Sequence, residues 1–125
     1  MKIKCIKIYN EQTKKYQDMS SWLTVGKEYI VLEILICPEK EVSYRLVGDN
    51  KNQMPAMYDA RQFEIISNAI PSNWIVKQLS SGRFIFSPAA WREPGFWESY
   101  YDHDPVALEI YKREARIIFE QENKP

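Results

Sequence analysis

Apolar and polar residues alternate along much of the first half of the chain in the two-residue rhythm of β-strands. The pattern is clearest over residues 42–46, where Val42, Tyr44 and Leu46 alternate with Ser43 and Arg45. Successive side chains of a strand point to opposite faces, so this segment is predicted to be a half-buried strand. Shorter apolar or β-branched runs predict further strands at residues 2–9, 28–36, 53–58 and 63–66.

Turn residues between these runs predict how the strands connect. The sequence GDNKN at residues 48–52 is rich in residues that tolerate positive φ, which predicts a hairpin. Residues 59–62 suit one tight helical turn, whereas the polar, irregular residues 10–21 suit a loop. A second hairpin is predicted over residues 74–86, where two strand-like runs flank Ser80, Ser81 and Gly82.

The period of the pattern changes to that of a helix near the end of the chain. Asp104 followed by Pro105 indicates an N-cap and a first helical residue, which opens a helix to about residue 122. Six apolar residues follow at helical spacing and predict a stripe that packs on the sheet: Ala107, Leu108, Tyr111, Ala115, Ile118 and Phe119. Ser87 before Pro88 predicts a shorter helical turn over residues 89–93.

The segments LTVGKEYIVLEI, SYRLVGDN and PAMYDARQFEII resemble the small SH3-like barrels of bacterial and phage proteins. The resemblance covers residues 22–67, and it implies that a helical turn precedes the last strand of the barrel. We therefore expect an α+β fold of one domain, residues 1–125. It would consist of a small antiparallel SH3-like β-barrel, a hairpin at 74–86 and a helical part at 88–122, with its last helix packed on the sheet.

Composition adds the expectation of a soluble, cytoplasmic protein. The 125 residues are 45% apolar, which suffices for one core, and the formal net charge is zero. The lysine-interrupted start lacks the apolar stretch of a secretory signal, and no apolar run is long enough to cross a membrane. Cys5 and Cys37 stand far apart outside any metal-binding motif, so we expect both to be reduced.

The residue types that catalysis requires are sparse. His103 is the sole histidine, and it lies between Asp102 and Asp104 at the predicted helix start, where we expect an exposed polar residue. The four glycines stand singly, so phosphate-binding and nucleophile-elbow motifs are absent. These observations predict a protein that is not an enzyme and that uses no cofactor and no metal. A carboxylate-only hydrolase built from the acids near His103 stays as an alternative.

The densest candidate surface is the segment from Trp91 to Asp104. It combines five aromatic residues with four acids, a mixture typical of interfaces, because aromatic anchors supply contact energy and carboxylates select a basic partner. Trp91, Phe96 and Trp97 are expected mainly to hold the last helix to the sheet. The predicted partner-binding residues are Glu93, Trp97, Glu98, Tyr100, Tyr101, Asp102 and Asp104.

The whole-chain pattern, with IPSNW and FSPAAWREPGFWESYYDHDP after the strands, resembles small bacterial immunity proteins of contact-dependent growth inhibition and other polymorphic toxin systems. This resemblance implies a toxin inhibitor that binds a cognate toxin domain in the cytoplasm. Many such toxins are nucleases with basic clefts, which an acidic surface would occlude.

An alternative function uses the opposite charge. Residues 1–20 carry five lysines (Lys2, Lys4, Lys7, Lys14 and Lys15) against two acids. A phage or mobile-element SH3-like accessory domain could contact nucleic acid or a ribonucleoprotein through them. The neutral total charge makes nucleic acid the less favoured partner, and no membrane partner is expected.

Overall fold

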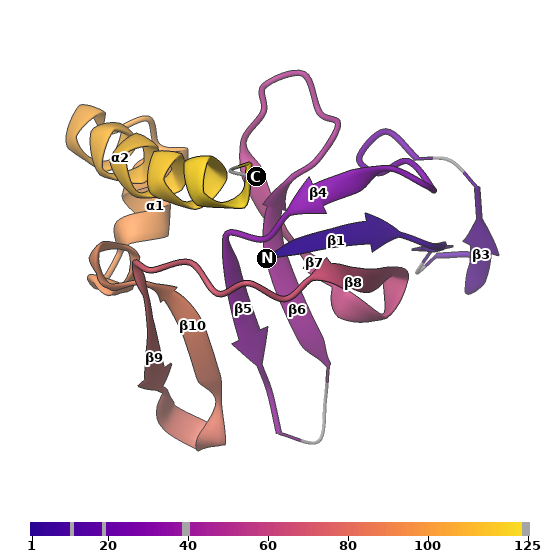
Figure 1. The fold of residues 1–125 in the computed structure, drawn as a ribbon, viewed down its shortest axis with the longest axis horizontal. Helices are drawn as coiled ribbons and strands as arrows, with labels where there is room; N and C mark the ends of the chain where they lie inside the picture. Colours follow the sequence, from indigo (N-terminus) through magenta and orange to yellow (C-terminus); the bar gives the residue numbers. More distant parts are fainter. Residues whose placement is uncertain (11, 19, 39–40, 124–125) are drawn as a thin grey trace.

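The computed structural model describes residues 1–10, 12–18, 20–38 and 41–123, and within them the chain has an α+β fold with three antiparallel sheets (Figure 1). The first sheet has the order β4 (Glu28–Ile30), β1 (Lys2–Cys5), β8 (Phe63–Ser67). The second has the order β7 (Pro55–Asp59), β6 (Val42–Val47), β5 (Glu33–Ile36), β10 (Phe84–Pro88), β9 (Trp74–Gln78). The third is a hairpin of β2 (Ile8–Asn10) and β3 (Lys15–Gln17).

Two α-helices follow the strands, and short 3₁₀ turns connect several of them. The turns are η1 (Ala60–Gln62), η2 (Ser80–Gly82) and η3 (Ala89–Arg92), and the helices are α1 (Phe96–Tyr101) and α2 (Pro105–Glu122). In Figure 1 the two helices lie together at one end of the molecule, and β3 of the small hairpin lies at the other end. The two helices and the small hairpin are therefore separate regions of the fold.

The expected closed barrel does not form among the described residues, where all three sheets are open. The predicted strand at residues 28–36 is interrupted between β4 and β5. Val31 N–H donates to the Met1 carbonyl (3.0 Å), whereas Leu32 N–H donates to the Arg45 carbonyl (2.8 Å). Because neighbouring residues bond to different sheets, β4 pairs with β1 and β5 pairs with β6. A sequence pattern registers the apolar run but not this change of partner.

Four other expectations need correction. Residues 2–9 form two strands, β1 and β2, and the predicted loop at residues 10–21 contains β3. Ser87 does not cap a helix: it lies in β10, its hydroxyl donates to the Pro88 carbonyl (3.1 Å), and η3 has no side-chain cap. Helix α1 was not expected, because Pro94 and Gly95 read as breakers, whereas Gly95 (φ 77°) instead precedes the helix as its N-cap.

The remaining elements are confirmed close to their predicted bounds. The hairpins β6–β7 and β9–β10 form, and Asp59 caps η1 by accepting from Arg61 N–H (2.8 Å). Asp104 caps α2 by accepting from Ala107 N–H (3.0 Å), with Pro105 at the first helical position. Turn and cap chemistry is local, so the sequence predicts it well.

Helix α2 packs chiefly on α1 and η3 rather than lying across the strands. Its predicted stripe is largely buried: Ala107, Tyr111, Ala115 and Ile118 are inside, and Leu108 and Phe119 are half-buried. These side chains belong to the same core cluster as Ile3 and Leu46 of the sheets. None of the helices in the described part of the chain is long and apolar enough to cross a membrane.

Candidate functional site

The aromatic residues around α1 form one stacked cluster against α2. Trp91, from η3, is 1% exposed, and its ring stacks on Tyr111 of α2 with the centroids 5.5 Å apart. Tyr100 lies 4.7 Å from the same Tyr111 ring, centroid to centroid, and Phe96 stacks on Trp91 at 6.5 Å. Burial raises the pKa of Tyr111 and of Tyr100. This cluster is the core of the helical end.

A buried charge triad ties α1 to the five-stranded sheet. Glu33 of β5 is fully buried, and it pairs with Arg45 of β6 (3.1 Å) and with Arg92 of η3 (3.0 Å). The Arg45 guanidinium also lies 3.9 Å from the Trp97 ring centroid and donates to the Tyr101 hydroxyl (3.0 Å). Desolvation lowers the pKa of Arg92, although the Glu33 carboxylate opposes the shift. Helix α1 is therefore held in one orientation.

The structure divides the seven predicted binding residues into three groups. Tyr100 is 5% exposed and belongs to the core, so it offers no surface to a partner in this structure. Trp97 is half-buried under Arg45, and Tyr101 is 39% exposed with its hydroxyl donating to the Pro55 carbonyl. The four acids, which are all exposed, are Glu93, Glu98, Asp102 and Asp104.

These four acids lie in or next to α1 in the sequence: Glu93 precedes the helix, Glu98 belongs to it, and Asp102 and Asp104 follow it. Glu98 and Asp102 are four residues apart, which places them on one side of the helix end, and Asp102 N–H donates to the Glu98 carbonyl (3.0 Å). Asp104 N–H donates to the Ser99 carbonyl (3.0 Å), which folds the next turn back onto α1. Within the described residues none of the four acids forms an ion pair with a base. We call Glu93, Glu98, Asp102, Asp104 and Tyr101 the acidic surface.

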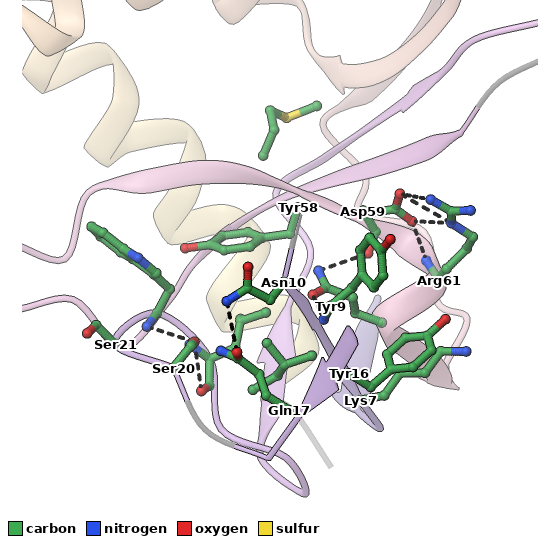
Figure 2. A pocket seen from close by; sticks show the side chains of 15 residues that line it. Lys7, Tyr9, Asn10, Tyr16, Gln17, Ser20, Ser21, Tyr58, Asp59 and Arg61 are labelled. Atoms are coloured by element: carbon green, nitrogen blue, oxygen red, sulfur yellow. Dashed lines mark hydrogen bonds and ion pairs between the residues drawn. The ribbon is translucent and has the colours of Figure 1, made fainter. Parts of the chain in front are cut away.

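A second site, which the sequence analysis missed, is a groove of about 730 Å³ at the other end of the molecule (Figure 2). Its walls come from the β2–β3 hairpin, from residues 20–23, and from β7 with η1. Figure 2 shows Asn10 beside Tyr58, whereas the Tyr9 ring lies on the side of Asp59 and Arg61. Tyr16 is 61% exposed and Trp22 is 54% exposed, so two large aromatic side chains of the lining are open to solvent. We call this site the hairpin groove.

Charged side chains at the hairpin groove are mostly paired with one another. Arg61 pairs with Asp59 (2.9 Å) and with Glu41 (2.9 Å), and these contacts lower the pKa of Asp59. Lys7 lies 4.7 Å from the Tyr16 ring centroid and has no carboxylate partner among the described residues. The groove thus keeps one cation available beside its aromatic wall.

The far wall of the hairpin groove, which residues 20–23 form, is stabilised by Asp49. Its carboxylate accepts from Lys27 (2.6 Å) and from Thr24 (2.7 Å), and its N–H donates to the Trp22 carbonyl (2.8 Å). Burial alone would raise the pKa of Asp49, but the hydrogen bonds from Lys27, Thr24 and Tyr29 lower it. For Tyr29, burial is the main reason that its pKa rises to about 12, and the nearby Asp49 adds to it.

The other chemistry considered from the sequence has little geometric support. No three His, Cys, Asp or Glu side chains gather as a metal site in the described ranges, and Cys5 and Cys37 are both free. On β1, Lys4 pairs in register with Glu28 on one side and with Glu64 on the other. Lys4 therefore lies between two acids, which weakens the attraction of this strand for phosphate.

The exposed aromatic residues of the hairpin groove had one signal in the sequence. Tyr16 stands in the polar, irregular stretch of residues 10–21 and Trp22 directly follows it, in contrast to the aromatic residues near α1, which stand close together in the sequence. Comparison of the chain with protein-family models, with curated proteins and with solved structures finds no match.

Proposed function

We propose that this protein is a non-enzymatic binding protein that recognises a basic surface of another protein through its acidic surface. The observation that carries the proposal is the set of four exposed carboxylates around α1, none of which has a basic partner among the described residues. Carboxylates left unpaired at a surface attract a cationic partner and speed its approach.

The support beneath the acidic surface suits a binding role. Helix α1 has only six residues, and so short a helix is not stable on its own. Here Trp91 and Tyr100 pack on Tyr111, Phe96 stacks on Trp91, and Arg45 lies over the Trp97 ring, so that the helix is held by tertiary contacts. A surface held rigid before binding loses less conformational entropy when the complex forms.

The partner that we propose is the cognate toxin of a bacterial immunity protein, with the complex formed in the cytoplasm. The toxin is proposed to be a nuclease whose basic active-site cleft the acidic surface covers. This assignment rests on the resemblance of the chain to immunity proteins and on the sign of the charge around α1. Occlusion requires no catalytic group, cofactor or metal.

The finer fold assignment is likewise a proposal: residues 22–67 would be an open variant of an SH3-like barrel. The order of the strands supports it. β1, which comes from outside this range, lies between β4 and β8, β6 lies between β5 and β7, and η1 separates β7 from β8. In such a variant the bend at Val31 and Leu32 would join the two sheets.

Charge reversal tests the proposed function. The double variant Glu98→Lys with Asp102→Lys would be compared with the unchanged protein in a pull-down with the product of the adjacent upstream gene. We expect the double variant to lose most of the bound partner, because two attractive contacts become repulsive. Retention equal to that of the unchanged protein would overturn the proposal, as would failure of the unchanged protein to bind.

Glu120→Lys is the matched control. Glu120 is an exposed acid of α2, and it lies about 24 Å along the helix from Asp104 at a rise of about 1.5 Å per residue. This variant makes the same charge change per site outside the acidic surface. We expect it to retain the partner, whereas Glu98→Lys alone, which makes the same change in net charge, is expected to weaken binding, so that this difference reports on α1 and not on net charge.

A further inference from the structure

The hairpin groove lies along an open sheet edge. β7 is the last strand of the five-stranded sheet, and Met57, Tyr58 and Asp59 of β7 line the groove. An edge strand carries backbone N–H and C=O groups that its own sheet does not use. The pairing of β7 with β6 decides which residues of β7 direct these groups away from the sheet.

Three contacts indicate that Met57 directs its backbone groups away from β6. Along an antiparallel strand the backbone groups of successive residues point alternately to the two sides. The Arg45 carbonyl accepts from Leu32 on the β5 side, so its register partner Met57 does not bond with it across the β6–β7 ladder. On β7, the Pro55 carbonyl accepts from the Tyr101 hydroxyl and the Asp59 carbonyl accepts from Gln62 Nε2 (3.4 Å).

Met57 lies midway between Pro55 and Asp59, so its N–H and C=O also point away from β6. The ladder bonds of β7 are then made by Ala56 and Tyr58, whose register partners are Leu46 and Tyr44. Within the described residues no contact outside the ladder takes up the Met57 backbone. Two outward carbonyls of this edge are satisfied by side chains, and the peptide groups of Met57 between them are left open.

Gln62 indicates what fits between the two walls. Its side chain is largely buried, and its amide oxygen accepts from Tyr9 N–H of β2 (3.0 Å) while its amide nitrogen donates to the Asp59 carbonyl of β7. One side-chain amide therefore bridges the facing edges of two strands, as a peptide group of an intervening strand would. Farther along, the residues of these two elements line the groove.

We propose that the hairpin groove binds an extended segment of another protein, which adds a strand to the edge of β7 by pairing with Met57. The segment continues the line of the Gln62 amide and spans about four or five residues at about 3.3 Å per residue. Its alternate side chains meet the exposed rings of Tyr16 and Trp22. A carboxylate on the segment is favoured beside Lys7, which is the cation of the lining without a carboxylate partner in the described part of the chain.

Amide hydrogen exchange tests the orientation of the edge without any ligand. We expect Met57 N–H to exchange at least about tenfold faster than the N–H groups of Ala56 and Tyr58, because only the latter two are bonded to β6. Protection of Met57 equal to that of its neighbours would overturn the proposal.

Peptide selection tests the ligand. A phage-displayed library of random dodecapeptides is selected on the full chain, and an enriched peptide is synthesised for titration. Met57→Pro removes the outward N–H but no ladder bond, and proline is tolerated on edge strands in that position. Met57→Leu keeps the N–H and is the matched control. We expect the proline variant to bind about tenfold more weakly and the leucine variant to bind within about twofold of the unchanged protein.

Two further variants keep the test decisive if Met57→Pro does not fold. Tyr16→Ala and Trp22→Ala change exposed side chains and are expected to weaken the peptide while leaving the fold intact. The proposal is overturned if no peptide is enriched, if peptides bind these variants as they bind the unchanged protein, or if the edge instead pairs with a second copy in sedimentation experiments. The inference does not rest on the acidic surface, so Glu98→Lys is expected to leave peptide binding unchanged.

Discussion

The two ends of this molecule use aromatic residues in opposite ways. At the helical end, Trp91 and Tyr100 are buried, and the exposed atoms belong mainly to acids. At the hairpin end, Tyr16 and Trp22 are more than half exposed, and they stand beside a groove and an open strand edge. The comparison teaches that local density of aromatic residues marks a core, whereas isolated aromatic residues in polar surroundings mark a surface.

Truncation of one tryptophan at each end is expected to give the largest difference between the two ends in the free energy of unfolding. Trp91→Ala removes a fully buried ring and is expected to lower the free energy of unfolding by about 3–5 kcal/mol. Trp22→Ala removes a ring that is 54% exposed and is expected to cost less than about 1 kcal/mol. Urea denaturation measures both. Similar losses in the two variants would show that the ends do not differ in this way.

The buried charge triad gives the next largest effect. Glu33→Gln leaves Arg45 and Arg92 buried without a carboxylate, which is expected to cost about 3 kcal/mol. Because Arg45 also contacts Trp97, the variant should change the fluorescence of the helical end before global unfolding. Reversal of an exposed acid, Glu98→Lys, should leave both readouts nearly unchanged. An unaltered denaturation midpoint for Glu33→Gln would contradict the role given to the triad.

Gly48→Ala probes the far wall of the hairpin groove. A Cβ at Gly48 would lie 2.5 Å from the Trp22 carbonyl oxygen and 2.7 Å from the Tyr58 hydroxyl, so groove residues must move. The expected cost is about 1–3 kcal/mol, with NMR shifts at Trp22 and Tyr58. Gly26→Ala meets no atom within 4 Å but is strained by its φ of 91°, so it should cost about 1 kcal/mol without moving Tyr58.

The smallest predicted effect is a pH dependence at the same wall. The folded pKa of Asp49 lies below its ordinary value of 3.8. At pH values between the folded and the unfolded pKa, the unfolded chain therefore binds more protons than the folded protein. The contribution of Asp49 to stability is complete above pH of about 4 and is lost as the pH falls through the folded pKa. Urea denaturation between about pH 2.5 and 6 should show a flatter acid limb for Asp49→Asn than for the unchanged protein. Parallel curves would contradict the assignment.

Local chemistry decided which parts of this fold could be predicted from the sequence. The Asp104 cap, the Asp59 turn and the alternation of Val42, Tyr44 and Leu46 each depend on neighbours in the chain. The open sheets could not be predicted, because the bend at Leu32 depends on a bond to Arg45, thirteen residues away in sequence. A short helix such as α1 likewise depends on tertiary contacts more than on its own sequence.

The two candidate sites differ in the same way, because only the features that depend on residue type could be predicted from the sequence. The acids of the acidic surface could be found by charge alone, because an unpaired carboxylate is seldom buried. The burial of Tyr100 could not, since it depends on Tyr111 of another helix. The hairpin groove was missed because its walls come from three segments, and because the direction of the Met57 backbone follows from strand pairing rather than from any residue type.

The association rate with the proposed partner, measured as a function of salt, tests the central claim most directly. If the acidic surface steers a basic partner, the rate for the unchanged protein should fall about tenfold or more between about 50 and 500 mM salt. The double variant Glu98→Lys with Asp102→Lys should start slower and lose that dependence, while Glu120→Lys should follow the unchanged protein. Equal rates and equal salt dependence for all three proteins would contradict the claim that the carboxylates around α1 recognise the partner.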